Sequence, residues 1–142
     1  VVKTGENPSH YTRKIPPYED LCSVEKREIE AEIAEVLRRI GVPAHIRGYA
    51  YLKAAITLAL TNMEMLQSVT RKLYPAVAES FNTTGSRVER SIRHAIESAW
   101  DRGESAQKEA LFGYTIHKAK GKPTNSEFIA LITDKLKMDF GW

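Results

Sequence analysis

The residues of this sequence that are best suited to chemistry gather on one face of a predicted helix, residues 86–101. With about 100° between successive residues, the apolar side of this helix centres near Val88 and Ala99. The side chains that lie opposite are Arg90, Arg93, His94 and Glu97, and Arg87 and Glu89 flank the first turn. Arginine can donate two hydrogen bonds to guanine and glutamate can accept one from cytosine, so Arg87, Glu89 and Arg90 have the chemistry to read base edges. The alternative is a solvated helix face of mixed charge.

A second group of basic residues suits contact with the phosphate backbone of a nucleic acid. Arg93 and His94 lie further along the predicted helix, where a helix rises out of a DNA groove. Lysines at positions 118, 120 and 122 follow in a loop that contains glycine and proline, and cations there can neutralise phosphates. The alternative for Lys118, Lys120 and Lys122 is a loop of solvated lysines.

Motifs for catalysis and metal binding are missing from the sequence. The four histidines stand more than 20 residues apart, so no two of them have the spacing of a helical metal site. Cys22, the single cysteine, lies in a polar stretch and matches no nucleophile motif. The sequence therefore predicts no enzyme, no metal and no cofactor. An enzyme with a helical active site would need a pocket that gathers His, Asp and Glu side chains.

The segment from Ala78 to Ala99 fits a helix-turn-helix by position. In that motif a small residue lets two helices approach, a left-handed residue four positions later makes the turn, and a β-branched residue ten positions after the small one anchors the second helix. Ala78, Asn82 and Val88 occupy these places, and asparagine tolerates the left-handed conformation. Ser91 departs from the motif, because an apolar residue is common there.

Apolar stripes at helical spacing predict two helices before this motif. The first starts near Val24 and ends at Gly41, since glycine readily adopts the left-handed conformation that closes helices. The second starts near Tyr49, keeps Met63 on its apolar side and ends between residues 62 and 67.

The rest of the chain also reads as helical. The third helix, roughly residues 69–81, has Val77 and Phe81 on its buried side. Capping boxes at Ser86-x-x-Glu89 and Thr124-x-x-Glu127 predict the starts of two later helices. With a short piece over residues 105–112, the sequence predicts an all-α fold of about six helices that contains a helix-turn-helix.

Length and composition fit one globular domain. The chain has 142 residues, 42% of them hydrophobic and 27% charged, which favours a folded domain over disorder. No apolar run is long enough to span a membrane, and one cysteine without an apolar leader favours a cytoplasmic protein. The net charge of +3 is too even to identify a nucleic-acid binder. We expect a linker or arm over residues 1–23 and a helical domain over residues 24–142.

Four strings of the sequence resemble the DNA-binding effector domain of the stage-zero sporulation protein A family, the master response regulators of spore-forming bacteria. They are IGVPAHIRGY (40–49), FNTTGSRVERSIRHAIE (81–97), LFGYTI (111–116) and KPTNSEFIA (122–130). The resemblance extends from about residue 29 to residue 136. It implies a six-helix domain with a helix-turn-helix, in agreement with the helices predicted from periodicity, and no catalytic activity.

The resemblance also implies a function, which is phosphorylation-controlled activation and repression of transcription at boxes of the TGTCGAA type. The family's base-reading string is intact at residues 86–90. It matches Arg87, Glu89 and Arg90 to base contacts. The expected contacts to the DNA backbone are Ser86, Arg93, His94, Lys118, Lys120 and Lys122.

Members of this family also contact the sigma subunit of RNA polymerase. The matching region here is residues 103–116, although residues 105–110 differ from the family. The expected sigma contacts are Gly103, Gln107, Glu109, Phe112 and Ile116. We expect as partners double-stranded DNA, in a dimer on DNA, the sigma subunit, and a receiver domain of the same chain that is not among these residues. The rival is a helical protein-interaction module, sigma-binding or anti-activator, without affinity for DNA.

Overall fold

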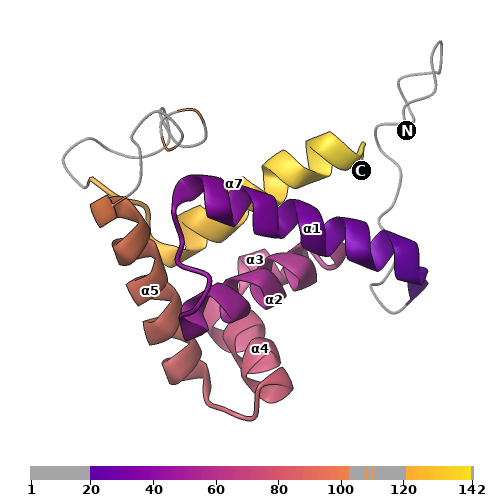
Figure 1. Cartoon of the computed structure of the whole chain (residues 1–142). Helices are drawn as coiled ribbons and strands as arrows, with labels where there is room; N and C mark the ends of the chain where they lie inside the picture. Colours follow the sequence, from indigo (N-terminus) through magenta and orange to yellow (C-terminus); the bar gives the residue numbers. More distant parts are fainter. Residues whose placement is uncertain (1–19, 103–107, 109, 111–120, 142) are drawn as a thin grey trace.

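The computed structural model describes residues 20–102, 108, 110 and 121–141, and within these it contains six α-helices, one π-helical segment and no strand. The predicted all-α fold is confirmed. The elements are α1 (Ser23–Ile40), α2 (Arg47–Thr61), α3 (Glu64–Gln67), η3 (Val69–Leu73), α4 (Tyr74–Ser80), α5 (Gly85–Arg102) and α7 (Asn125–Phe140), arranged as in Figure 1.

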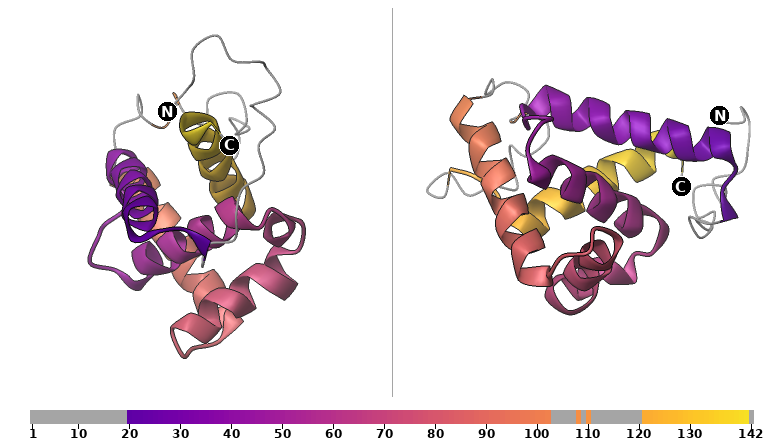
Figure 2. Two further views of the ribbon diagram at one scale, coloured as in Figure 1. Left: turned by 90° about the vertical axis from the view of Figure 1, so that its right-hand side faces the viewer. Right: turned by 60° about the horizontal axis from the view of Figure 1, so that its bottom comes forward.

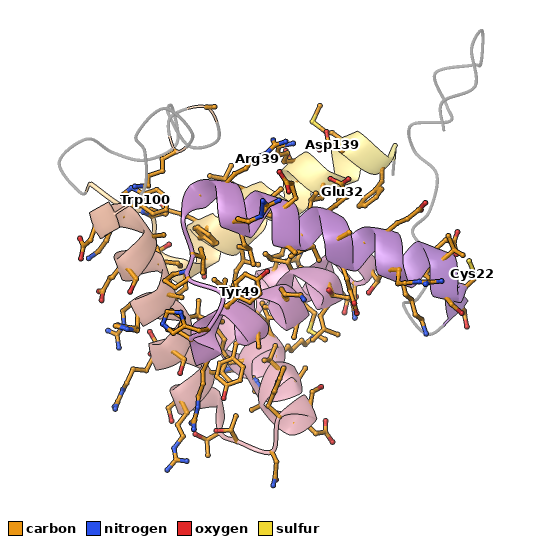
Figure 3. All side chains as sticks on the ribbon, viewed as in Figure 1. Cys22, Glu32, Arg39, Tyr49, Trp100 and Asp139 are labelled. Carbon is orange, nitrogen blue, oxygen red and sulfur yellow. The ribbon has the colours of Figure 1, made fainter. Side chains whose placement is uncertain are left out.

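Helix α1 has a well-defined cap at each end. The Cys22 thiol accepts a hydrogen bond from the Glu25 N–H at 3.4 Å, while the Glu25 carboxylate accepts one from the Cys22 N–H at 3.0 Å. Gly41 closes the helix with φ of 104°, as predicted. Figure 3 shows Cys22 at the start of α1, so the single cysteine serves as a helix cap.

Helix α2 lies at the centre of the domain and contacts α1, α5 and α7. Its apolar side is completely buried at Leu52, Ile56 and Leu60. At its start, a Cβ added to Gly48 would lie 2.2 Å from the carbonyl oxygen of Ser91. The backbones of α2 and α5 therefore touch at a position where no side chain fits, and this contact involves the residue that departs from the helix-turn-helix pattern.

Two predictions of buried residues are wrong. Met63 is 41% exposed, because α2 ends at Thr61 and the extended Asn62 turns the chain before α3 begins. Phe81 is 42% exposed, because it follows the last residue of α4 in a non-helical conformation. Its ring packs edge-on against Tyr51, with 5.0 Å between the ring centres.

The predicted third helix is two elements in the structure. Residues 69–73 form a π-helical turn, in which the Tyr74 N–H donates to the Val69 carbonyl five residues back. Pro75, the second residue of α4, has no N–H to donate to the preceding turn, which explains a change of hydrogen-bond pattern at this point. The buried side of α4 carries Val77 and Ala78 as predicted.

Helix α7 begins where the capping box predicts. Thr124 and Glu127 exchange both hydrogen bonds of the box, and Gly141 ends the helix with φ of 74°. The residues of α7 that are completely buried include Phe128, Ile129, Ile132 and Leu136. None of the helices in the described part of the chain is long and apolar enough to cross a membrane.

Candidate nucleic-acid interface

The turn between α4 and α5 has the geometry of a helix-turn-helix. Asn82 adopts φ of 55°, the one positive value at a non-glycine residue in the described ranges. The Thr83 N–H donates to the Ala78 carbonyl at 2.9 Å, which closes the turn. Ala78 is 4% exposed and Val88 is completely buried. All three residues that the motif requires therefore occupy the predicted positions, and Figure 2 shows α4 and α5 meeting at this turn.

The capping residue of α5 lies two residues before the predicted one. Helix α5 begins at Gly85, and the Thr84 hydroxyl accepts a hydrogen bond from the Arg87 N–H at 3.3 Å. Thr84 is therefore the cap, and the predicted Ser86 capping box is wrong. Both Thr84 and Ser86 are good capping residues, and the position of the left-handed Asn82 favours the earlier one. Ser86 itself is exposed in the first turn.

The two sides of α5 are sharply divided. The core side, completely or almost completely buried, consists of Val88, Ile92, Ala95, Ile96 and Ala99. The exposed residues on the other side are Ser86, Arg87, Arg90, Arg93 and His94, and Glu89 is partly exposed beside them. Helix α5 lies along one edge of the domain (Figures 1 and 2). The structure therefore presents on one accessible face all the residues of α5 that the sequence selects for DNA.

Weak ion pairs hold two of the cations near α5. Arg93 lies 3.5 Å from the carboxylate of Glu89, one turn back on the same helix. Lys122, from the loop before α7, lies 3.4 Å from the carboxylate of Glu97. All four side chains are about half exposed, and exposed pairs of this kind contribute roughly 0–1 kcal/mol. Both cations can therefore exchange their carboxylate for a phosphate at little cost.

A cleft of about 480 Å³ is lined by residues of η3, α4 and α5, the loop before α7 and the start of α7. Its lining residues include Arg93 and Lys122, together with Thr70 and Tyr74. It borders the flank of α5 that carries Glu89. Thr70 and Tyr74 could not be predicted as lining residues, because no pattern along the chain links η3 and α4 to residues some fifty positions later.

Asn125 is a third residue that the sequence alone did not indicate. Its side-chain amide nitrogen lies 3.1 Å from the Tyr74 hydroxyl and 3.1 Å from the backbone carbonyl of Glu89, and it donates to both. Burial raises the pKa of Tyr74, and this hydrogen bond partly offsets the rise. The KPTNSEFIA string contains this asparagine, but its partners become visible only in three dimensions.

Several predicted site residues lie outside the described residues. They are the five sigma contacts, Gly103, Gln107, Glu109, Phe112 and Ile116, and the two lysines Lys118 and Lys120. Lys108, within the same region, is described. Its amino group donates to the Trp100 carbonyl at 3.4 Å and lies 5.4 Å from the centre of the Trp100 ring, at the end of α5 far from α4 (Figure 3). Burial lowers its pKa.

The described ranges contain no group of three or more His, Cys, Asp and Glu side chains that could hold a metal ion. His45 and His94 are both exposed.

Comparison with protein families agrees with this arrangement. The family model described as "Sporulation initiation factor Spo0A C terminal" matches residues 33–136. The match covers α2, then α4 and α5, which are the two helices of the helix-turn-helix, and α7 as far as Leu136.

Proposed function

The chain belongs to the Spo0A C-terminal family of DNA-binding sporulation regulators, and we propose that it recognises TGTCGAA-type boxes through α5. The observation that carries this proposal is the helix-turn-helix geometry combined with the exposed charged face of α5. The left-handed Asn82 and the buried Val88 fix α5 against α4. A helix fixed in this way can enter a major groove with its N-terminal residues against the base edges.

In this proposal the first two turns of α5 read sequence. Arg87 and Arg90 donate to the O6 and N7 atoms of guanines, and Glu89 accepts from the amino group of a cytosine. Both arginines are exposed, and within the described part of the chain neither forms an ion pair that would have to break. Glu89 must release Arg93 before it can turn to a base, and their separation of 3.5 Å makes this a weak contact.

Contacts to the DNA backbone set the position of the helix. Ser86 at the start of α5 and Arg93 and His94 further along lie on both flanks of the base-reading residues. Lys122 reaches the same surface from the loop before α7. We assign these four residues to phosphates, together with Lys118 and Lys120, because cations beside a groove supply affinity without sequence information.

Regulation of transcription requires a partner besides DNA. We propose that residues 103–116 contact the sigma subunit of RNA polymerase, that the domain dimerises on DNA, and that a receiver domain controls it through phosphorylation. The anchoring of Lys108 on Trp100 supports a surface next to α5 for the sigma contact. In reconstituted transcription, Gln107→Arg and Glu109→Lys should lower activation and leave box affinity intact. Normal activation by both variants would refute these two contacts.

A band-shift assay tests the proposed function. The duplexes are one with a TGTCGAA-type box and one with the same bases in scrambled order, each at two salt concentrations. We expect the box to bind more tightly at both, with affinity for each duplex falling as salt rises. A protein-interaction module would show neither a sequence preference nor a salt dependence, and that result would overturn the proposal.

A further inference from the structure

One side-chain amide ties the start of α7 to both helices of the helix-turn-helix. Asn125, the first residue of α7, donates one hydrogen to the Tyr74 hydroxyl and the other to the Glu89 carbonyl, each over 3.1 Å. Tyr74 is the first residue of α4, and Glu89 lies in the base-reading part of α5. The same amide therefore contacts both helices whose relative position defines the motif.

Neither α5 nor α7 needs this contact in order to form. The carbonyl of Glu89 lies inside an α-helix, where the N–H four residues on already serves as donor. Helix α7 has its cap in Thr124, whose hydroxyl accepts from the Glu127 N–H at 3.1 Å. The amide of Asn125 is therefore not needed to cap its own helix. We infer that its two hydrogen bonds act instead on the position of α5.

The start of α7 is held in place by its capping box and by the core. Thr124 and Glu127 bind one another in both directions, and Phe128 and Ile129 follow directly as completely buried core residues. Asn125 is therefore held between a closed capping box and the core. A fixed donor at this position restrains how far α5 can slide or turn against α4.

We propose that Asn125 is a positioning residue that sets the base-reading part of α5 in register with the groove, a role that rests on the proposed function of α5. Glu89, which receives the hydrogen bond on its backbone, and Arg90 after it are two of the three base readers. Hydrogen bonds to base edges demand close geometry, whereas long cationic side chains can follow a phosphate over some distance. Loss of the restraint should therefore lower sequence preference more than affinity for DNA as such.

The test compares the ratio of box affinity to scrambled-duplex affinity among variants. Asn125→Asp keeps the shape of the side chain but cannot donate to a carbonyl, and any repulsion of DNA by its charge cancels in the ratio. We expect this ratio to fall about three- to tenfold, which is the net contribution of about one hydrogen bond. Tyr74→Phe removes one of the two acceptors and should lower the ratio less.

Two controls separate positioning from stability and from the proposed function. Ile33→Val removes a methylene from the core on α1, where Ile33 is completely buried. It should lower the unfolding temperature and leave the ratio unchanged, because a loss of folded protein affects both duplexes equally. Arg90→Ala removes a base reader and should lower the ratio whatever the role of Asn125.

The outcomes are distinct. A lower ratio in Asn125→Asp and Tyr74→Phe, with an unchanged ratio in Ile33→Val, supports the positioning role. An unchanged ratio in both variants, while Arg90→Ala lowers it, overturns the positioning role and leaves the proposed function standing. A wild type without preference for the box overturns the proposed function itself. If Asn125→Asp does not fold, an unchanged ratio in Tyr74→Phe still refutes the inference.

Discussion

Gly48 lies directly against the backbone carbonyl of Ser91, so closely that the two helices leave no space for a methyl group. A Cβ at Gly48 would lie 2.2 Å from this oxygen and 2.7 Å from the Cβ of Ala95. The contact fixes the middle of α5 to the first turn of α2, while the turn at Asn82 fixes its start to α4. The face of α5 that carries the charged residues is therefore presented by a rigid support.

Gly48→Ala should destabilise the domain by about 1–3 kcal/mol, because the clash is with backbone and cannot be relieved by a side-chain rotation. Gly85→Ala is the matched control, since its Cβ would meet its nearest neighbour, the Tyr74 Cβ, at an ordinary 3.6 Å. Urea unfolding of both variants measures the difference. Equal stabilities would show that α2 and α5 can separate without cost.

Removal of the Glu89 carboxylate should broaden sequence preference. Glu89→Ala takes away the acceptor for one cytosine and also an acidic group beside a polyanion, so binding to other sequences should be unchanged or slightly tighter. Glu79→Ala, which removes an exposed acid from α4, controls for the change in charge. Titration of a set of boxes with single base changes measures the effect. A large loss that is equal on every duplex would contradict a base-reading role.

Arg93 should behave in the opposite way, because a phosphate contact carries no sequence information. Arg93→Ala is expected to weaken binding to box and scrambled duplexes alike and to reduce the slope of log affinity against log salt by roughly one. Arg38→Ala, at an exposed arginine on α1, should leave the slope unchanged. An unaltered slope in Arg93→Ala would indicate that Arg93 is a solvated side chain that contacts no phosphate.

Stability at high pH should depend on Tyr74. Burial raises the pKa of its phenol above 10.0, with a smaller lowering by the hydrogen bond from Asn125. A raised pKa in the folded state stabilises the fold fully below the unfolded pKa, and this contribution is lost as pH rises through the folded value. The difference in unfolding free energy between wild type and Tyr74→Phe should therefore stay constant up to about pH 9 and shift against wild type above 10. A constant difference at all pH values would contradict this.

The helix-turn-helix could be predicted from the sequence, but the contacts that hold it against the rest of the domain could not. Asn82, Ala78 and Val88 act through local backbone geometry, which spacing along the chain reveals. The contacts of Gly48 with Ser91 and of Asn125 with Tyr74 join residues more than forty positions apart, and no periodicity within one helix indicates them. The errors at Phe81 and Ser86 have a local cause, because each lies within two residues of a helix end, where neighbouring positions compete to be the boundary.

Base recognition by α5 can be tested at the level of one side chain and one base atom. Each guanine of the box is replaced in turn by 7-deazaguanine, which lacks the N7 acceptor, and the affinities of wild type and Arg90→Ala are measured on every duplex. If Arg90 reads a guanine, one replacement should weaken wild type by about 1–3 kcal/mol relative to the intact box and leave Arg90→Ala almost unaffected. If every replacement affects the two proteins equally, Arg90 does not read a guanine through N7, and the assignment of Arg90 to sequence recognition by α5 is wrong.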